Sequence, residues 1–198
     1  MEQMNLQIFM AMNAHAGLHG FPLLFSIFLA RYLIYLVPLM MVTGWLWGNS
    51  RERAQMVLTF IAIAIGLWMA MFTGHHWFYP RPDVLGLGNT YLSHSADSSF
   101  PSDHMTVMWA ATLGFLMIKG MRTRGLVILC ASLTVAWARI FLGLHFPLDM
   151  IGAIVIATTS IILTKIFEPL IANFLTPSIE RVYRLVFRFA IEKKWVKR

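Results

Sequence analysis

RIFLGLHFPLD, residues 139–149, joins the last two long apolar runs of the chain. Pro147 suits the first turn of a helix, so this stretch predicts the end of one membrane helix and the beginning of the next. It places Arg139, His145 and Asp149 beside segments that are otherwise apolar. Ionisable groups are costly in a bilayer and usually mark a functional site, so these three residues are the first site candidates.

The composition predicts an integral membrane protein with an all-α fold. The chain has 198 residues, of which 58% are hydrophobic and 13% charged, with a mean hydropathy of +0.66. A soluble domain would carry about 25% charged residues. The net charge of +7 resembles that of nucleic-acid binders, but most cations lie at helix ends and in the tail, so we expect no nucleic-acid partner. Cys130 is the only cysteine, which excludes an internal disulfide.

Five apolar segments are candidates to span a bilayer, which requires about 20 helical residues. Residues 4–18 are apolar but interrupted by polar side chains, which predicts an interfacial or re-entrant helix. We therefore expect a polytopic membrane helix bundle as one integral membrane domain over residues 1–176. Residues 177–198 form a basic amphipathic tail. The predicted spans are 22–47, 54–78, 104–118, 126–144 and 147–165.

The distribution of Lys and Arg predicts the orientation of the bundle. Cations gather in the first link, the third link and the tail, whereas the second and fourth links carry only Arg81 and Arg139. By the positive-inside rule the first link, the third link and the tail are cytoplasmic, so Arg81 and Arg139 lie on the outer side. The cytoplasmic cations are Arg51, Arg53, Lys119, Arg122, Arg124, Arg181, Arg184, Arg188, Lys193, Lys194, Lys197 and Arg198.

The end of the second span carries the sequence HHWFYPRP, residues 75–82. Pro80 and Pro82 flank Arg81 and stop the helix there. A guanidinium presents a planar fork of donors that matches phosphate oxygens. The alternative is an arginine that extends to the membrane interface.

The third span begins with Pro101, Ser102, Asp103 and His104. Proline suits the first turn of a helix, and Ser102 or Asp103 can cap it. The free amides and positive dipole end of that turn attract an anion. The alternative is plain capping beside a packed histidine.

Asp149 follows His145 by four residues, so a helix there brings the two side chains together. A carboxylate on one ring nitrogen fixes the tautomer and leaves the other nitrogen free to attack. The alternative is a capping aspartate beside an interfacial histidine. All three motifs fall on one predicted membrane face. Their combination there indicates an enzyme that acts on a phosphorylated lipid.

These motifs, in this order and spacing, resemble the type 2 phosphatidic-acid phosphatase superfamily over residues 54–165. Residues 94–104, HSADSSFPSDH, resemble the bacterial undecaprenyl-diphosphate phosphatase branch associated with bacitracin resistance. The resemblance implies a multi-pass enzyme of the bacterial inner membrane with an outward-facing site. It would hydrolyse undecaprenyl diphosphate to the monophosphate and so recycle the lipid carrier for cell-wall synthesis.

The resemblance also implies a role for each motif residue. His145 would attack phosphorus and form a phosphohistidine, and Asp149 would orient it. His104 would protonate the leaving oxygen and then activate water. Arg81, Arg139 and the Pro101–Ser102–Asp103 turn would bind substrate, with Ser102 and the two arginines holding phosphoryl oxygens. No metal or cofactor is implied, and the expected partners are the lipid diphosphate and membrane lipids, without an obligate protein partner.

Two positions depart from the family pattern. Gly74 stands where the family usually has lysine, and His75, His76 or Arg31 could replace that cation. Asp103 stands where many members have glycine, and we expect its carboxylate to turn away from substrate, to cap the helix or to hold a cation.

Further residues are expected around the site. Arg31 could meet the diphosphate, pair with Asp149 or Asp97, or extend to the interface. Asp97 could orient His104 or Arg139. The link 83–100, which includes His94, is either a lid over the site or an ordinary loop.

Other functions remain open from the sequence. The chain could be a phosphatase for phosphatidic acid or phosphatidylglycerol phosphate. It could be a lipid transporter that binds phosphate without cleaving it. A phosphotransferase would differ only in using an alcohol instead of water.

Overall fold

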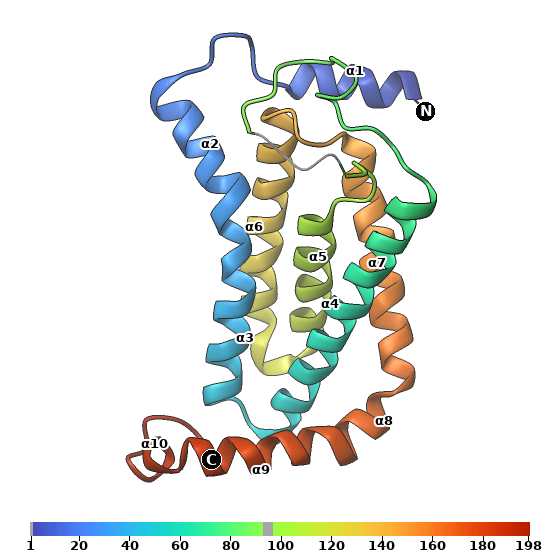
Figure 1. Cartoon of the computed structure of the whole chain (residues 1–198). Coiled ribbons are helices and arrows are strands. Elements are labelled where there is room, and N and C mark those ends of the chain that lie inside the picture. The colour runs from blue at the N-terminus through green and yellow to red at the C-terminus, as the bar shows by residue number, and fades with distance from the viewer. Residues whose placement is uncertain (1, 93–96) are drawn as a thin grey trace.

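The computed structural model describes residues 2–92 and 97–198, and these residues form helices without any β-strand. Figure 1 shows α2 to α7 running alongside one another, with α1 across one end of the bundle and α8 to α10 at the other. The helices are α1 (Glu2–Met12), α2 (Gly20–Tyr32), α3 (Leu36–Trp47), α4 (Ser50–His76), α5 (Asp103–Met117), α6 (Arg122–Phe141), α7 (Pro147–Ile166), α8 (Glu168–Leu170), α9 (Thr176–Val186) and α10 (Arg188–Glu192). Short 3-10 turns, η1 (Leu33–Tyr35) and η2 (Lys119–Met121), and a π-helical turn, η3 (Ile171–Leu175), complete them.

Four helical segments within the described chain are long and apolar enough to cross a membrane: Gly20–Trp47, Ser50–His76, Lys119–Phe141 and Pro147–Ile166. They correspond to the predicted first, second, fourth and fifth spans. The predicted third span is the 15-residue helix α5, which is too short by this measure. It begins only after Pro101 and Ser102, and Lys119 follows its end. The all-helical class is therefore confirmed for the described residues, and the count of five spans stays a prediction.

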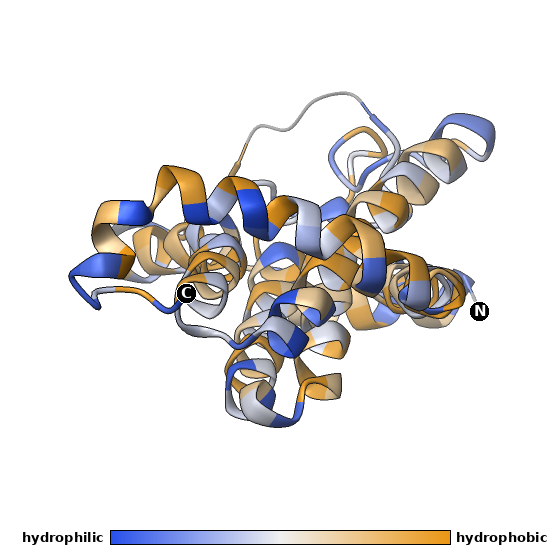
Figure 2. Ribbon diagram, turned by 90° about the horizontal axis from the view of Figure 1, so that it is seen from below, coloured by the Kyte–Doolittle hydropathy of each residue, from blue (hydrophilic) through white to orange (hydrophobic). Residues whose placement is uncertain are grey.

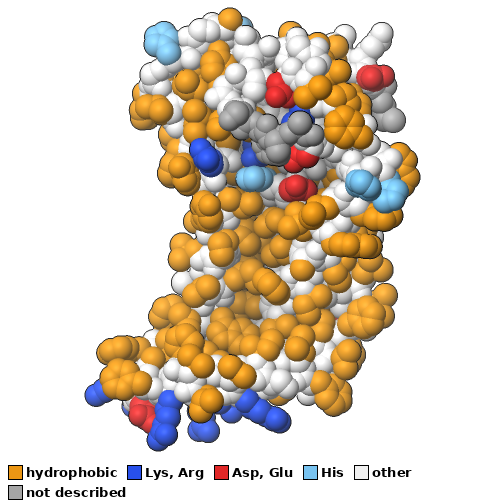
Figure 3. Space-filling model, viewed as in Figure 1, with side chains coloured by type: hydrophobic (Ala, Val, Ile, Leu, Met, Phe, Trp, Pro, Cys, Tyr) orange, Lys and Arg blue, Asp and Glu red, His pale blue; other side chains and the backbone are white. Residues whose placement is uncertain are grey.

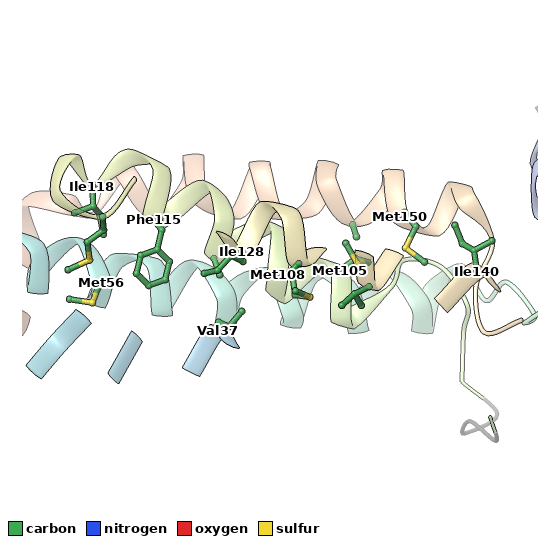
Figure 4. Packing of buried hydrophobic residues seen from close by; sticks show 14 of the residues in the cluster. Val37, Met56, Met105, Met108, Phe115, Ile118, Ile128, Ile140 and Met150 are labelled. Carbon is green, nitrogen blue, oxygen red and sulfur yellow. The ribbon is translucent and has the colours of Figure 1, made fainter. Parts of the chain in front are cut away.

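The short helix α5 occupies the centre of the bundle, where it packs against α4, α6 and α7. Met105, Met108 and Phe115 are fully buried there. Figure 4 shows this core running lengthwise, from Phe115 and Ile118 at one end to Met105 near the other. Close contact with α4 depends on a glycine, because a Cβ added at Gly114 would lie 2.3 Å from the Thr59 hydroxyl oxygen. Packing in this core fixes the position of α5 along the bundle, and with it the position of the motif at its first turn.

The helix α1 closes the end of the bundle that carries the motifs. The Asn5 side chain accepts a hydrogen bond from the Leu148 amide at 3.0 Å, at the first turn of α7. The Phe9 ring packs on Phe146 with centroids 5.1 Å apart. Figure 1 shows α1 lying across the bundle instead of along it. It thus covers the α6–α7 turn, and its interfacial or re-entrant placement in a bilayer stays a prediction.

The tail closes the opposite end, and a buried arginine holds it. Arg53 is fully buried, and its guanidinium donates to the Trp45 carbonyl at 3.0 Å and to the Lys197 carbonyl at 2.9 Å. It pairs with Glu180 of α9 at 3.5 Å and lies 4.6 Å from the Tyr183 ring centroid. In Figure 2, α9 alternates between hydrophilic and hydrophobic residues, as expected of an amphipathic helix. The tail is thus tied to the α3–α4 turn.

We expect Arg53→Ala to lower the melting temperature of the detergent-purified protein by roughly 5–10 °C, because it leaves Glu180 buried with less compensation. Arg51→Ala is the matched control, since Arg51 lies two residues before Arg53 on the same helix and is exposed. A melting temperature equal to that of wild type would mean that the tail does not depend on this contact.

Candidate active site

A cavity of about 290 Å³ brings the three motifs together. Arg81 reaches it from the link after α4, His104 from α5, Arg139 from α6 and His145 from the α6–α7 turn. Asp103 also lines it. Figure 3 shows charged and histidine side chains gathered toward the end of the bundle that α1 covers, above a mainly apolar surface. Its remaining lining is apolar and consists of Ile34, Leu67 and Val107.

The surroundings of His145 fix its tautomer. Nδ1 lies 3.0 Å from the Ser99 carbonyl oxygen and 3.1 Å from Asp149 Oδ2, and both are acceptors. Nε2 lies 3.2 Å from Arg81 Nη1 and 3.3 Å from Arg139 Nη2, and both are donors. This network assigns the proton to Nδ1 and leaves a lone pair on Nε2. The unprotonated nitrogen is therefore the one beside the two guanidiniums.

Asp149 is held rigidly behind the imidazole. Its Oδ2 accepts hydrogen bonds from the Phe146 amide at 2.8 Å and from the Ser99 hydroxyl at 2.5 Å. Pro147 occupies the first turn of α7, so residue 149 falls in the same turn and its carboxylate reaches back to the helix start. This local helix accounts for the i, i+4 contact with His145 that the spacing predicts. The carboxylate is buried and does not line the cavity.

Ser99 is a site residue that the motifs did not reveal. Its side chain is fully buried, its hydroxyl donates to Asp149, and its carbonyl accepts from His145. It lies in the link before α5, 46 residues from His145 in sequence. A single serine in a loop carries no spacing or periodicity signal, so only the fold brings it to the imidazole.

Arg81 is buried, with 3% of its surface exposed, and it is held by a backbone carbonyl and a carboxylate as well as by its contact with His145. Its guanidinium donates to the Leu144 carbonyl at 3.0 Å and pairs with Asp97, with Nη2 2.8 Å from Oδ1. The sequence did not predict this pairing of Asp97 with Arg81, and the expectation that Asp97 orients His104 or Arg139 stays a prediction. Asp97 precedes the motif in the same link as Ser99, and the turn of that link aims it at the arginine.

Arg139 places a second cation beside the first. It is 4% exposed, and Nη1 donates to the Ala30 carbonyl of α2 at 3.4 Å. Arg81 and Arg139 both approach Nε2 of His145, so two guanidiniums converge on one atom. Like charges so close repel each other, and an anion between them relieves that repulsion. The arrangement suits a phosphoryl group.

The second motif is only partly arranged as expected. Ser102 is the residue before α5, yet its side chain makes no capping hydrogen bond, and its buried hydroxyl has no hydrogen-bond partner among the described residues. It does not line the central cavity. Pro101 lines a neighbouring cavity of about 410 Å³. The Ser102 amide donates to the Asp149 carbonyl at 3.3 Å, which ties the second motif to the third.

Asp103 lies beside the site and does not cap α5, because Ser102 holds the capping position and Asp103 is the first residue of the helix. It is exposed and lines both the central cavity and its neighbour. The expectation that its carboxylate turns away from substrate or holds a cation stays a prediction. An acidic group thus stands at the boundary between the two cavities.

Gly74, which stands where the family usually has lysine, packs closely against the link before α5. A Cβ added at Gly74 would lie 3.1 Å from Ser98 Cβ and 3.4 Å from the Phe100 carbonyl. His75 is exposed and lines the neighbouring cavity. His76 is exposed as well, and its Nδ1 lies 2.9 Å from the Phe72 carbonyl of its own helix.

Neither the histidines nor Arg31 take the predicted positions at the centre. His75, His76 and Arg31 do not line the central cavity. Arg31 is exposed on α2 and forms no ion pair with any described residue, including Asp97 and Asp149. His94 and the middle of the predicted lid lie outside the described residues. Within the described chain, no group of three His, Cys, Asp or Glu side chains is arranged to hold a metal ion.

Comparisons with known proteins agree with this geometry. A family model described as the PAP2 superfamily matches residues 54–171. YbjG of Escherichia coli (strain K12), provisionally named an undecaprenyl-diphosphatase, is 34% identical over 100% of this chain and 99% of its own. Undecaprenyl-diphosphatase BcrC of Bacillus subtilis (strain 168) is 31% identical over 96% of this chain and 97% of its own.

A solved structure shares the fold. The crystal structure of Aquifex aeolicus LpxE superposes with a TM-score of 0.64 at 20% identity, covering 81% of this chain and 94% of that one. The family match includes Arg81, the Pro101–His104 motif and the Arg139–Asp149 motif, and each of the three contributes residues to the lining of the cavity. On this match and on two relatives aligned over nearly their whole length, the chain belongs to the PAP2 superfamily.

Proposed function

We propose that this protein is a membrane phosphatase that hydrolyses undecaprenyl diphosphate to undecaprenyl phosphate and inorganic phosphate. The observation that carries the proposal is His145, whose Nδ1 faces acceptors while Nε2 faces two arginines. The names of the relatives YbjG and BcrC support the choice of substrate.

The first step is attack by His145. The terminal phosphoryl group enters between Arg81 and Arg139, whose donors move from Nε2 to its oxygens. The Nε2 lone pair then forms a bond to phosphorus as the bond to the bridging oxygen breaks. His104, which lines the same cavity, gives that oxygen its proton, and undecaprenyl phosphate leaves. Asp149 stabilises the cationic imidazole that results.

The second step regenerates the enzyme. His104, now unprotonated, takes a proton from water as the water oxygen attacks the phosphohistidine phosphorus. The phosphorus–nitrogen bond breaks, and its electron pair returns to Nε2. Inorganic phosphate is released, and both histidines recover their starting states. The two guanidiniums stabilise the charge spread over the phosphoryl oxygens in both steps.

The protein side chains provide the positive charge that this reaction requires. Arg81 and Arg139 are buried and fixed by the Leu144 and Ala30 carbonyls before substrate arrives. We therefore expect phosphate release to continue in excess EDTA, within about twofold of the rate without chelator. Loss of activity that added Mg²⁺ restores would contradict this mechanism.

The orientation in the membrane belongs to the same proposal. The site lies on the outer side of the bacterial inner membrane, because the links at the opposite end carry the excess cations. The buried helix α5 acts as a fifth, shortened span, surrounded by α4, α6 and α7. The residue 177–198 tail then lies against the cytoplasmic leaflet, where α9 presents Arg181 and Arg184 and α10 presents Arg188.

The experiment is phosphate release by the purified full-length protein. Undecaprenyl diphosphate, phosphatidic acid and phosphatidylglycerol phosphate are compared in the same detergent. We expect the highest kcat/KM for the isoprenoid diphosphate. A higher value for either glycerophospholipid would replace the proposed substrate. Lipid movement across vesicles without phosphate release would replace the enzyme with a transporter.

We expect Ser99→Ala to reduce kcat by about tenfold while KM changes little, because the variant loses one hydrogen bond to the Asp149 carboxylate. The backbone carbonyl that accepts from His145 remains. Ser98→Ala is the matched control, since Ser98 is the adjacent serine and its hydroxyl contacts only backbone groups. Equal rates for Ser99→Ala and wild type would exclude a positioning role for this hydroxyl.

A further inference from the structure

A larger cavity, separate from the two at the active site, lies at the opposite end of the bundle. Its volume is about 620 Å³, and every residue that lines it is apolar or aromatic. Its walls come from α3 and α4, and its floor is the apolar face of α9. Representative lining residues are Met41, Trp45, Phe60, Val182 and Phe187.

The two cavities lie between the same two helical walls. Ile34 lines the active-site cavity and Pro38 lines the apolar one, four residues further along the η1–α3 segment. On α4, Leu67 lines the first cavity and Phe60 the second. Residues spaced by four or seven positions lie on one face of a helix. One face of each wall therefore serves both cavities.

The distance between the cavities is short. One helical turn separates Ile34 from Pro38 and two turns separate Phe60 from Leu67, which is about 6 Å and about 10 Å along the helix axes. Ala64 lies between Phe60 and Leu67 on the same face, and its small side chain is exposed. Figure 3 shows an apolar, hollowed strip below the charged cluster on this side of the molecule.

We propose that the apolar cavity above α9 binds the distal isoprene units of the substrate's lipid chain. This inference rests on the proposed function and deepens it, because it assigns a binding site to the lipid chain of the substrate as well as to its diphosphate. The lipid chain would extend from the catalytic cavity past Ala64 and end against α9. A polyprenyl chain offers only hydrocarbon to a binding site, and a lining of aliphatic, methionine and aromatic side chains matches it.

The proposal gives the enzyme a means to select chain length. A short isoprenoid ends before Ala64 and makes contact only with the upper walls. A long one also gains the burial that the lower cavity provides. The tail helix α9 forms the floor, so the contact of Arg53 with Glu180 holds a part of the binding site in place.

The kinetic experiment compares a long and a short substrate. Phosphate release from undecaprenyl diphosphate and from isopentenyl diphosphate, which carries a single isoprene unit, is measured with full-length protein in phosphatidylethanolamine–phosphatidylglycerol vesicles. We expect Ala64→Trp, which fills the passage, to lower the ratio of kcat/KM for the long substrate to that for the short one by about tenfold, the effect of losing about two buried methylene groups. Val155→Trp is the control, because Val155 is exposed on α7 and lines neither cavity.

A labelling experiment on the wild-type protein does not depend on how the variants fold. An undecaprenyl diphosphate analogue with a diazirine on its last isoprene unit is photolysed with the protein, and labelled peptides are identified. Labels on α3, α4 or α9 near the cavity support the proposal. Labels elsewhere, or occupation by vesicle phospholipid alone, overturn it. If the wild-type protein releases no phosphate from unlabelled undecaprenyl diphosphate, the proposed function fails. If it releases phosphate but Ala64→Trp leaves the ratio of the two kcat/KM values unchanged, only the proposed site for the lipid chain fails.

Discussion

His145→Ala should abolish phosphate release from undecaprenyl diphosphate, with kcat at least roughly 10⁴-fold lower, as removal of a nucleophile does in other enzymes with covalent intermediates. No other described side chain stands in for it, because His104 approaches the cavity from α5 and Asp149 lies behind the imidazole. Initial rates over a wide range of enzyme concentration would measure the residual activity.

The control for that variant is His19→Ala. His19 is exposed in the link before α2, far in sequence from the three motifs, and its ring contacts only the nearby Gly17 carbonyl. Melting curves of both variants verify that they fold. Substantial turnover by a folded His145→Ala protein would exclude the imidazole as the attacking group.

Asp149→Asn should reduce kcat on the order of 10³- to 10⁴-fold while leaving KM nearly unchanged, because it disturbs the tautomer of His145 and not the phosphate-binding arginines. An amide that turns its NH₂ group toward Nδ1 requires Nδ1 to be the acceptor. The proton then moves to Nε2, where it removes the attacking lone pair.

Steady-state kinetics and the melting temperature separate this effect from unfolding. The same Oδ2 accepts from the Phe146 amide, so an asparagine that turns its NH₂ group toward Nδ1 also loses that bond at the start of α7, and the melting curve measures this cost. Asp83→Asn is the matched control, since Asp83 is exposed in the link after Arg81. A variant with unchanged kcat would show that the carboxylate does not set the state of His145.

Apolar length and proline placement were sufficient to predict the long helices and the three motifs at their ends. The pairing of His145 with Asp149 followed from i, i+4 spacing because Pro147 begins a helix there. The length of α5 was not predictable by the same reasoning. Its ends depend on the turn at Ser102 and on its enclosure by three neighbouring helices, and hydropathy describes neither.

The contacts that residues 97–100 make with other segments could be identified only from the folded structure. Asp97 meets Arg81 and Ser99 meets Asp149 because the link turns over the α6–α7 corner. Those pairs are 16 and 50 residues apart in sequence. For the same reason the sequence could not tell that Gly74 packs against Ser98, or that Arg31 is exposed and does not line the cavity.

The attacking atom, Nε2 of His145, is open to direct detection. Enzyme mixed with substrate labelled in its terminal phosphoryl group is quenched in base within milliseconds, and the digested peptides are mapped by mass spectrometry. We predict an acid-labile, base-stable phosphoryl group on His145 that is absent from His145→Ala. Turnover without any phosphoprotein, or a phosphoryl group on another residue, would contradict the mechanism.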